Sequence, residues 1–261
     1  MPELTSGQYQ LVYNALSLAV AAMLGSFLFF FMARQQLTAK YRPAMIMSSL
    51  VVGIAGYHYF RIFNSWHDAY QLSAAGTYVA TGAPFNDAYR YVDWLLTVPL
   101  LVAELVAVLV LGREVRNSLM GKLVIASVAM IALGYPGEIA SSAGNRHLWG
   151  LLSTIPFVYI LYVLWRELGK AAANNSAQTR KLLTNTKLLL LATWGFYPLA
   201  YLMPLVGVSG ASAEVGLQLG YSIADIAAKC GYGIMIYAIA RSKMEAENAS
   251  VDANEVHAVA T

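Results

Sequence analysis

The stretch that decides the fold is YRYVDWLLTVPLLVAEL, residues 89–105. Most of its side chains are apolar, and a helix of this length approaches the thickness of the hydrocarbon core of a bilayer. It nevertheless carries Arg90, Asp93 and Glu104, and ionisable groups in hydrocarbon are costly. Such groups are kept where they are paired or serve a function, so the rest of the chain should supply their partners.

The whole chain has the composition of a membrane protein. Of its 261 residues, 58% are hydrophobic and 12% are charged, and the charged share is about half of that in soluble domains. Apolar runs long enough to span a bilayer, at about 20 residues each, occur at 9–33, 43–66, 88–111, 118–136, 146–168, 182–206 and 214–240. The sequence predicts an all-α membrane protein, a bundle of seven transmembrane helices within 1–243, followed by a disordered cytoplasmic tail at 244–261.

Charge distribution predicts the orientation. Lys and Arg gather after the first, third and fifth runs and just after the seventh, and by the positive-inside rule these segments face the cytoplasm. The N-terminus is then outside and the C-terminus cytoplasmic. The longest outer connection, 71–87, is compatible with a short hairpin. The single cysteine, Cys230, excludes an intramolecular disulfide and a cysteine metal cluster, and the net charge of +3 gives no reason to expect nucleic-acid binding.

Two carboxyl groups share one face of the third predicted helix. At about 100° per residue, Thr97 lies about 40° and Glu104 about 20° from Asp93, and the two carboxyl groups are roughly 16 Å apart along the axis. Asp93 then lies toward the outside, Glu104 toward the cytoplasm, and Arg90 one turn further out than Asp93. Glu104 has no cation within a helical turn, so its carboxyl group is expected to stay protonated and to be able to hand over a proton.

The seventh predicted helix supplies the complementary charge. Within GYSIADIAAKCGYGIMIYAIA, residues 220–240, Asp225 and Lys229 share a face. A lysine near the middle of the bilayer must be paired, neutral or modified, and a desolvated lysine amine is a good nucleophile toward a carbonyl carbon. Lys229 could thus form a Schiff base, with carboxylate counter-ions. The alternative is a buried salt bridge with Asp225 or Asp93 that only ties helices together.

Aromatic residues provide walls for an apolar ligand. Tyr91 and Trp94 flank Asp93, and WGFYP in the sixth predicted helix carries Trp194, Tyr197 and Pro198. Rings from two helices can sandwich a long conjugated molecule. Ordinary core packing is the alternative for any one of these aromatic residues.

The motifs RYVDWLLTVPLL, WGFYP and DIAAK, in the third, sixth and seventh predicted helices, together resemble the microbial (type 1) rhodopsins. The resemblance covers nearly the whole chain and implies all-trans retinal bound covalently to Lys229 as a protonated Schiff base. The triplet Asp93, Thr97 and Glu104 is similar to the signature of outward proton pumps of the proteorhodopsin and xanthorhodopsin branch. It implies Asp93 as counter-ion and proton acceptor and Glu104 as cytoplasmic proton donor. Asp225 resembles the second counter-ion.

Further roles rest on the resemblance alone. Arg90 resembles the gate-side cation, and His58 the histidine that pairs with the acceptor aspartate in this branch. Leu101 resembles the position that favours green over blue absorption. Ser153 and Thr154 resemble residues near the ring end of retinal.

Gly150 is similar to the glycine of xanthorhodopsin-type proteins. In those proteins the missing side chain opens a window for a carotenoid antenna. Close packing of helices is the alternative, because small residues are common where membrane helices meet. The resemblance therefore implies a hydroxylated carotenoid as a second chromophore.

The resemblance implies a light-driven outward proton pump, which is an ion transporter and not an enzyme, in the plasma membrane of a bacterium (the inner membrane). Its partners would be protons, membrane lipid, a carotenoid and further copies of itself in a pentamer or trimer. Two alternatives stay open. One is a sensory photoreceptor of the same fold, and the other is a retinal-free membrane transporter or receptor with a buried Lys–Asp pair.

Overall fold

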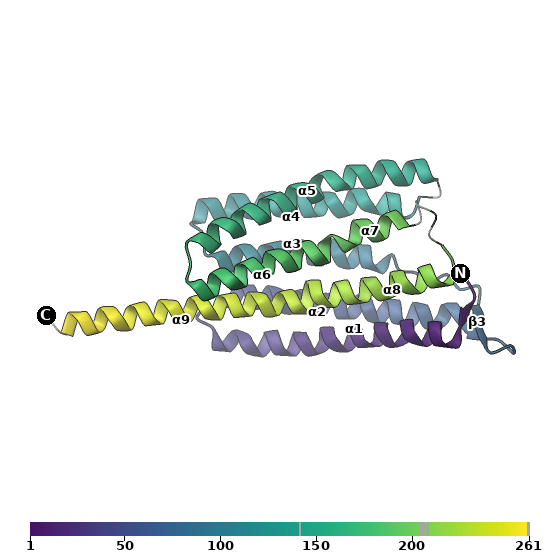
Figure 1. Cartoon of the computed structure of the whole chain (residues 1–261), viewed down its shortest axis with the longest axis horizontal. Coiled ribbons are helices and arrows are strands. Elements are labelled where there is room, and N and C mark those ends of the chain that lie inside the picture. Colours follow the sequence, from purple (N-terminus) through teal and green to yellow (C-terminus); the bar gives the residue numbers. More distant parts are fainter. Residues whose placement is uncertain (141, 204–206, 208, 260–261) are drawn as a thin grey trace.

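The computed structural model describes residues 1–140, 142–203, 207 and 209–259. Its long helices run side by side along the molecule, with the two termini at opposite ends (Figure 1). The α-helices are α1 Ser6–Ala33, α2 Arg42–Ala69, α3 Tyr89–Leu109, α4 Arg113–Glu138, α5 Ala143–Ala173, α6 Ala177–Trp194, α7 Phe196–Leu202, α8 Ala211–Asp225 and α9 Tyr232–Val259. A short 3-10 helix, Arg34–Gln36, follows α1, and a π-helix, Ile226–Gly231, joins α8 to α9.

Six helical segments are long and apolar enough to cross a membrane: Ser6–Gln36, Arg42–Ala69, Tyr89–Leu109, Arg113–Glu138, Ala143–Ala173 and Ala211–Val251. The seventh member of the bundle is the pair α6 and α7, which packs between α5 and the last helix. The expected all-α seven-helix membrane fold is therefore confirmed.

The sixth predicted helix, 182–206, is broken in the structure. It begins earlier, at Ala177, and is interrupted at Gly195, while residues 204–206 lie outside the described part of the chain. At the break the N–H of Gly195 donates to the carbonyl oxygen of Leu191 at 3.0 Å. A Cβ atom at Gly195 would lie 2.7 Å from that same oxygen, so glycine is the residue that permits this turn.

The last helix is nearly continuous and contains a π-helical turn. α8, the π-helix Ile226–Gly231 and α9 lie in line (Figure 1). Lys229 sits inside this turn. Single π-helical turns within α-helices occur frequently at functional sites because they re-aim side chains locally.

The C-terminal segment differs from its prediction. Disorder is expected over 244–261, but the structure continues α9 to Val259, well beyond the ends of the other helices (Figure 1). Glu247 is held by a tertiary contact, since its Oε1 accepts hydrogen bonds from Lys40 Nζ and Tyr41 OH, both at 2.7 Å. Composition alone does not contain this contact with the segment between α1 and α2.

A small antiparallel sheet covers the opposite end of the bundle. Strands β1 Leu4–Thr5, β2 Tyr70–Leu72 and β3 Thr77–Ala80 pair in the order β1-β3-β2. The hairpin expected within 71–87 is present as β2 and β3, and the added strand β1 was not expected. The Tyr9 ring of α1 stacks on Tyr78 of β3, with centroids 3.8 Å apart, which fixes the sheet against α1.

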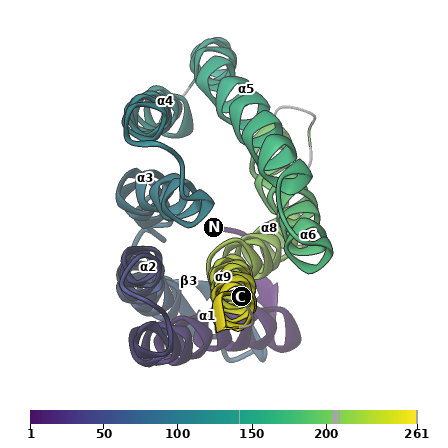
Figure 2. The ribbon, with the colours of Figure 1, turned by 90° about the vertical axis from the view of Figure 1, so that its left-hand side faces the viewer.

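Successive helices pack against one another around the bundle, and α8 and α9 close it by contacting α1 and α6 (Figure 2). The apolar windows of α3 and the last helix are 61% and 56% buried, against 11% for α5. The two helices that carry the unexpected charges are therefore the most enclosed of the spanning helices. This arrangement keeps those charges away from lipid.

Gly233 of α9 tests how tightly the last helix packs. A Cβ atom there would lie 2.5 Å from Cζ of the fully buried Phe30 ring in α1. We expect Gly233→Ala to lower the free energy of unfolding by about 1–3 kcal/mol through overpacking. Gly216→Ala, in α8, is the matched control, because no atom lies within 4 Å of its added methyl group. Thermal loss of helical circular dichroism in detergent measures both; equal melting temperatures would contradict the packing.

Candidate functional site

Lys229 lies between two carboxylates at the centre of the bundle. Its side chain is 2% exposed, and Nζ lies 2.7 Å from Oδ1 of Asp225 and 3.1 Å from Oδ2 of Asp93. Asp93 comes from α3, whereas Asp225 and Lys229 come from the last helix, one turn apart. The structure thus joins the two predicted counter-ions to one buried amine.

The two carboxylates differ in their hydrogen bonding. Asp225 accepts a hydrogen bond from Tyr59 OH at 2.7 Å and another from Tyr197 OH, in addition to the contact with Lys229. Apart from Lys229, neither oxygen of Asp93 has a hydrogen-bond partner among the described residues. Hydrogen bonds to a carboxylate stabilise its charged form. Asp93 is therefore the carboxylate with free capacity to accept a proton.

His58 and Thr97 lie beside Asp93 without bonding to its carboxylate. His58 Nδ1 is 4.0 Å from Asp93 Oδ1 but 3.0 Å from the carbonyl oxygen of Ile54 in its own helix. The Thr97 hydroxyl donates to the backbone carbonyl oxygen of Asp93 at 2.9 Å. Both predicted residues are thus brought to Asp93, where they shape its surroundings.

Arg90 links the centre to the end of the bundle that carries the sheet. The side chain is 2% exposed, and Nη2 donates to Oε1 of Gln218 at 2.7 Å. Gln218 Nε2 in turn donates to Oε1 of Glu214 at 3.0 Å. A second nitrogen of Arg90 lies 3.5 Å from Asp87. Sequence reasoning missed Gln218, because an uncharged amide on a helix carries no signal until its partner is known.

Glu104 lies deep in the opposite half of the bundle. Its side chain is fully buried, Oε2 accepts a hydrogen bond from the Ser48 hydroxyl of α2 at 2.5 Å, and Oε1 has no partner among the described residues. The contacts of this side chain in the described structure include no cation. A buried carboxyl group in such surroundings is accommodated as the neutral acid. Ser48 is a second residue that the sequence did not single out.

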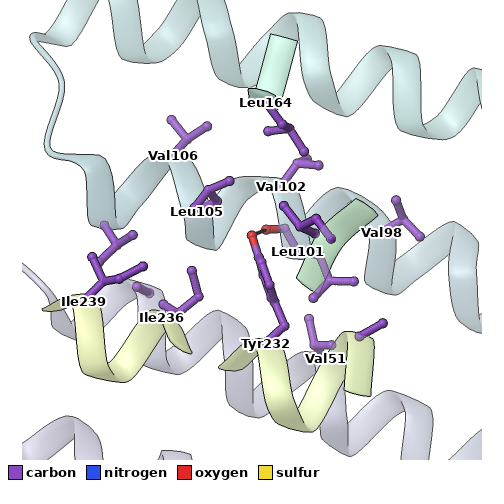
Figure 3. Close-up of a cluster of buried hydrophobic side chains, with 14 of the residues drawn as sticks. Val51, Val98, Leu101, Val102, Leu105, Val106, Leu164, Tyr232, Ile236 and Ile239 are labelled. Atoms are coloured by element: carbon purple, nitrogen blue, oxygen red, sulfur yellow. Dashed lines mark hydrogen bonds between the residues drawn. The ribbon is translucent and has the colours of Figure 1, made fainter. Parts of the chain in front are cut away.

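An apolar cluster separates Glu104 from Lys229. Figure 3 shows side chains of α3 facing side chains of α9, and the labelled members include Val98, Leu101, Val102, Leu105, Val106, Tyr232, Ile236 and Ile239. The one polar contact drawn is the Tyr232 hydroxyl, which donates to the carbonyl oxygen of Leu101 at 3.3 Å. Along α3, three members of this cluster, Val98, Leu101 and Val102, come between Asp93, which contacts Lys229, and Glu104. Packed apolar side chains therefore lie between the predicted donor and the level of the buried amine.

A pocket between the helices has Lys229 in its lining. The ten residues that sequence and resemblance assign to cofactor binding all line it: Tyr91, Trp94, Leu101, Gly150, Ser153, Thr154, Trp194, Tyr197, Pro198 and Lys229. The Trp94 and Tyr197 rings meet edge to face, with centroids 5.1 Å apart. The walls are mostly apolar and aromatic, as in sites that enclose an extended apolar molecule.

Several pocket residues were missed. α4 contributes Met130, Ile131 and Gly134, apolar or small residues that resemble ordinary core positions. A Cβ atom at Gly134 would be 3.3 Å from the Tyr91 ring, so the glycine makes room for that aromatic wall. Tyr221 also lines the pocket, and only the fold shows that it faces inward.

Gly150 lies under the ring of Tyr201. A Cβ atom at Gly150 would be 2.7 Å from Cε1 of that ring. The Tyr201 hydroxyl donates to the carbonyl oxygen of Arg146 at 2.7 Å, and the Arg146 guanidinium carbon lies 4.9 Å from the ring centroid. The missing side chain thus lets an aromatic ring settle on α5, beside the pocket.

The bacteriorhodopsin-like protein family model matches residues 11–243. The chain belongs to this family. It is 34% identical over 226 residues to the green-light absorbing proteorhodopsin of Gamma-proteobacterium EBAC31A08, a match that covers 85% of this chain and 84% of that protein.

Solved structures of rhodopsins resemble this one closely. The crystal structure of thermophilic rhodopsin is 53% identical with a TM-score of 0.91, and it matches over 95% of this chain and 99% of its own. Xanthorhodopsin, a light-driven ion pump with dual chromophore, is 54% identical with a TM-score of 0.90 and the same coverage. The chain is thus a microbial rhodopsin of the proton-pump branch and a multi-pass protein of the plasma membrane, as the resemblance implied.

Proposed function

We propose that this rhodopsin is a light-driven outward proton pump with all-trans retinal bound covalently to Lys229. Membership of the family and the similarity to xanthorhodopsin, a light-driven ion pump, support light-driven ion transport. The observation that carries the finer proposal is the asymmetry around Lys229. The carboxylate of Asp93, which has no hydrogen-bond partner other than Lys229 among the described residues, lies 3.1 Å from Nζ. The fully buried carboxyl group of Glu104 lies further along α3, past Val98, Leu101 and Val102 of the apolar cluster.

The pocket supports retinal as the chromophore. Its aromatic and apolar lining includes a buried primary amine, which is the group that condenses with an aldehyde. When bound, retinal supplies light absorption and a light-driven change of shape. The chain supplies the walls, the two carboxylates and the exclusion of water.

The first proton transfer runs from the nitrogen of Lys229 to Asp93. Asp225 is a poorer acceptor, because Tyr59 and Tyr197 already donate hydrogen bonds to it and stabilise its charged form. The proton leaves a cationic nitrogen and neutralises a carboxylate, so the charge of the buried group as a whole is unchanged. Asp225 remains the fixed counter-ion throughout.

The second transfer runs from Glu104 to the same nitrogen. Ser48 orients the carboxyl group of Glu104. The apolar side chains packed between α3 and α9 block the path of the proton until they move apart. Arg90, Gln218 and Glu214 form a chain of polar contacts on the other side of Asp93. Acceptor and donor therefore communicate with opposite faces of the membrane.

The distribution of basic residues supports outward pumping. Lys and Arg flank the ends of the helices on the Glu104 side of the bundle, among them Lys40, Arg42, Arg113, Arg116, Lys170, Arg180 and Lys243. By the positive-inside rule this side is cytoplasmic. Glu104 then takes protons from the cytoplasm, and Asp93 passes them outward. The expected pentamer or trimer stays a prediction.

Light-induced pH changes test the pump. Cells that express the protein with added retinal should acidify the medium on illumination, and a protonophore should abolish the signal. Lys229→Ala should give neither pigment nor signal, because the attachment amine is gone. A pigment with a slow photocycle and no pH change would instead favour a sensory photoreceptor, and a colourless wild-type protein would favour a retinal-free transporter.

Substitution of the two carboxyl groups separates their roles. Glu104→Gln should slow reprotonation of the Lys229 nitrogen by about 100-fold or more, the usual loss on removing a proton-transfer group, and leave the colour nearly unchanged. Asp93→Asn should shift the colour and stop transport. Flash photolysis and absorption spectra measure both effects. Glu114→Gln, at an exposed carboxyl group of α4, is the control; normal reprotonation in Glu104→Gln would refute the donor role.

We also propose that Gly150 admits a hydroxylated carotenoid antenna beside Tyr201. The carotenoid should give an induced circular-dichroism band and transfer excitation energy to retinal. Gly150→Trp should abolish both signals, because its side chain must displace the Tyr201 ring. Gly144→Trp is the matched control on α5, because nothing lies within 4 Å of a Cβ atom there. Equal binding by wild type and Gly150→Trp would reduce Gly150 to a packing residue.

A further inference from the structure

A second pocket lies on the outside of the bundle, between α5 and α6. Its lining is apolar except for one lysine, Lys187, and includes Leu161, Leu164, Leu168, Leu190 and Leu191. We call this lining, together with Trp165, the α5–α6 groove. It is separate from the pocket at Lys229, and the proposed transport does not use it.

Lys187 is a cation without an acidic partner among the described residues. Its Nζ lies 3.9 Å from the centroid of the Trp165 ring, an arrangement that stabilises an ammonium group by cation–π attraction. The neighbouring carboxylate on α5, Glu167, is engaged by Lys170 at 2.8 Å and Arg166 at 4.0 Å. The charge of Lys187 is therefore left uncompensated beside an apolar groove.

Space for a further group exists next to this ammonium. At Gly169 a Cβ atom would lie in van der Waals contact with Lys187 Nζ, at 3.8 Å, so a larger residue there would extend over the nitrogen and the glycine does not. Trp165 is 48% exposed, so this part of the groove is open to the surroundings of the bundle. A ligand group can reach Nζ without moving a side chain of residue 169.

The depth of the ammonium fits the bilayer interface. Gly169 precedes the end of α5 at Ala173 by about 6 Å along the axis. Lys187 begins deeper on α6, and its side chain extends toward that end, as snorkelling lysines do. Tryptophan is likewise enriched at the level of lipid headgroups. The leucines of the groove continue from this level toward the middle of the membrane.

We propose that the α5–α6 groove is a binding site for an anionic phospholipid. The phosphate of the lipid pairs with Lys187, and an acyl chain lies along the leucines. A zwitterionic lipid is bound less well, because its own ammonium group offsets the phosphate. One basic residue near the surface gives a preference of about fivefold for anionic lipid. The proposal does not depend on proton pumping.

Quenching of Trp165 by brominated lipids tests the site. The retinal-bound protein is placed in nanodiscs of phosphatidylcholine with increasing brominated phosphatidylglycerol, or brominated phosphatidylcholine as the comparison. The signal of Trp165 is obtained by difference from Trp165→Phe. Half-quenching is expected at an about fivefold lower mole fraction of the anionic lipid.

Lys187→Gln should remove this preference, whereas Lys181→Gln, at an exposed lysine of the same helix, should keep it. Soluble inorganic phosphate should not restore fluorescence, which distinguishes a lipid from a free anion. Equal quenching curves for the two lipids in the wild type would overturn the proposal. So would an unchanged preference in Lys187→Gln, or displacement by phosphate alone. Absorption spectra of all variants verify that the fold and pigment are intact.

Discussion

The structure depends on one electrostatic arrangement, the buried Lys229 held between Asp93 and Asp225. An isolated ion in the hydrocarbon region is costly, and removing one partner of a buried pair typically costs about 3–5 kcal/mol. Two carboxylates beside one amine reduce this cost only if the remaining negative charge is also stabilised. The hydroxyl groups of Tyr59 and Tyr197 do so at Asp225. The three charged residues and the two tyrosines come from four segments, α2, α3, α7 and the last helix, so this arrangement requires the assembled bundle.

The same group explains why polar and apolar regions alternate along the molecule. Toward the end with the sheet, Arg90, Gln218 and Glu214 continue the polar contacts. Toward the other end, the buried side chains of Val98, Leu101 and Val102 come before Glu104 along α3. They pack in one apolar cluster with Tyr232 (Figure 3). A continuous polar path would let protons run back down their gradient. The interruption on one side is therefore as necessary to a pump as the charges themselves.

The sequence alone identifies the residues whose burial in an apolar helix is energetically costly, because a charge is evident within the sequence of a single helix. Asp93, Glu104 and Lys229 stand out because a charge in an apolar run needs a reason, and helical periodicity places them on common faces. Ser48, Tyr59 and Gln218 do not stand out, because hydroxyl and amide groups are common in membrane helices and their importance lies in a partner on another helix. The contact of Glu247 is missed for the same reason, because this residue looks like a solvated acid until Lys40 and Tyr41 are found beside it.

The interruption at Gly195 leaves a separate short helix, α7, after α6. Tyr197 and Tyr201 lie one turn apart on α7, whereas Trp194 ends α6. Tyr197 donates a hydrogen bond to Asp225, and the ring of Tyr201 covers Gly150. A single short helix therefore ties the fixed carboxylate beside the buried amine to the far wall of the pocket, so a change at either place reaches the other through one turn of backbone.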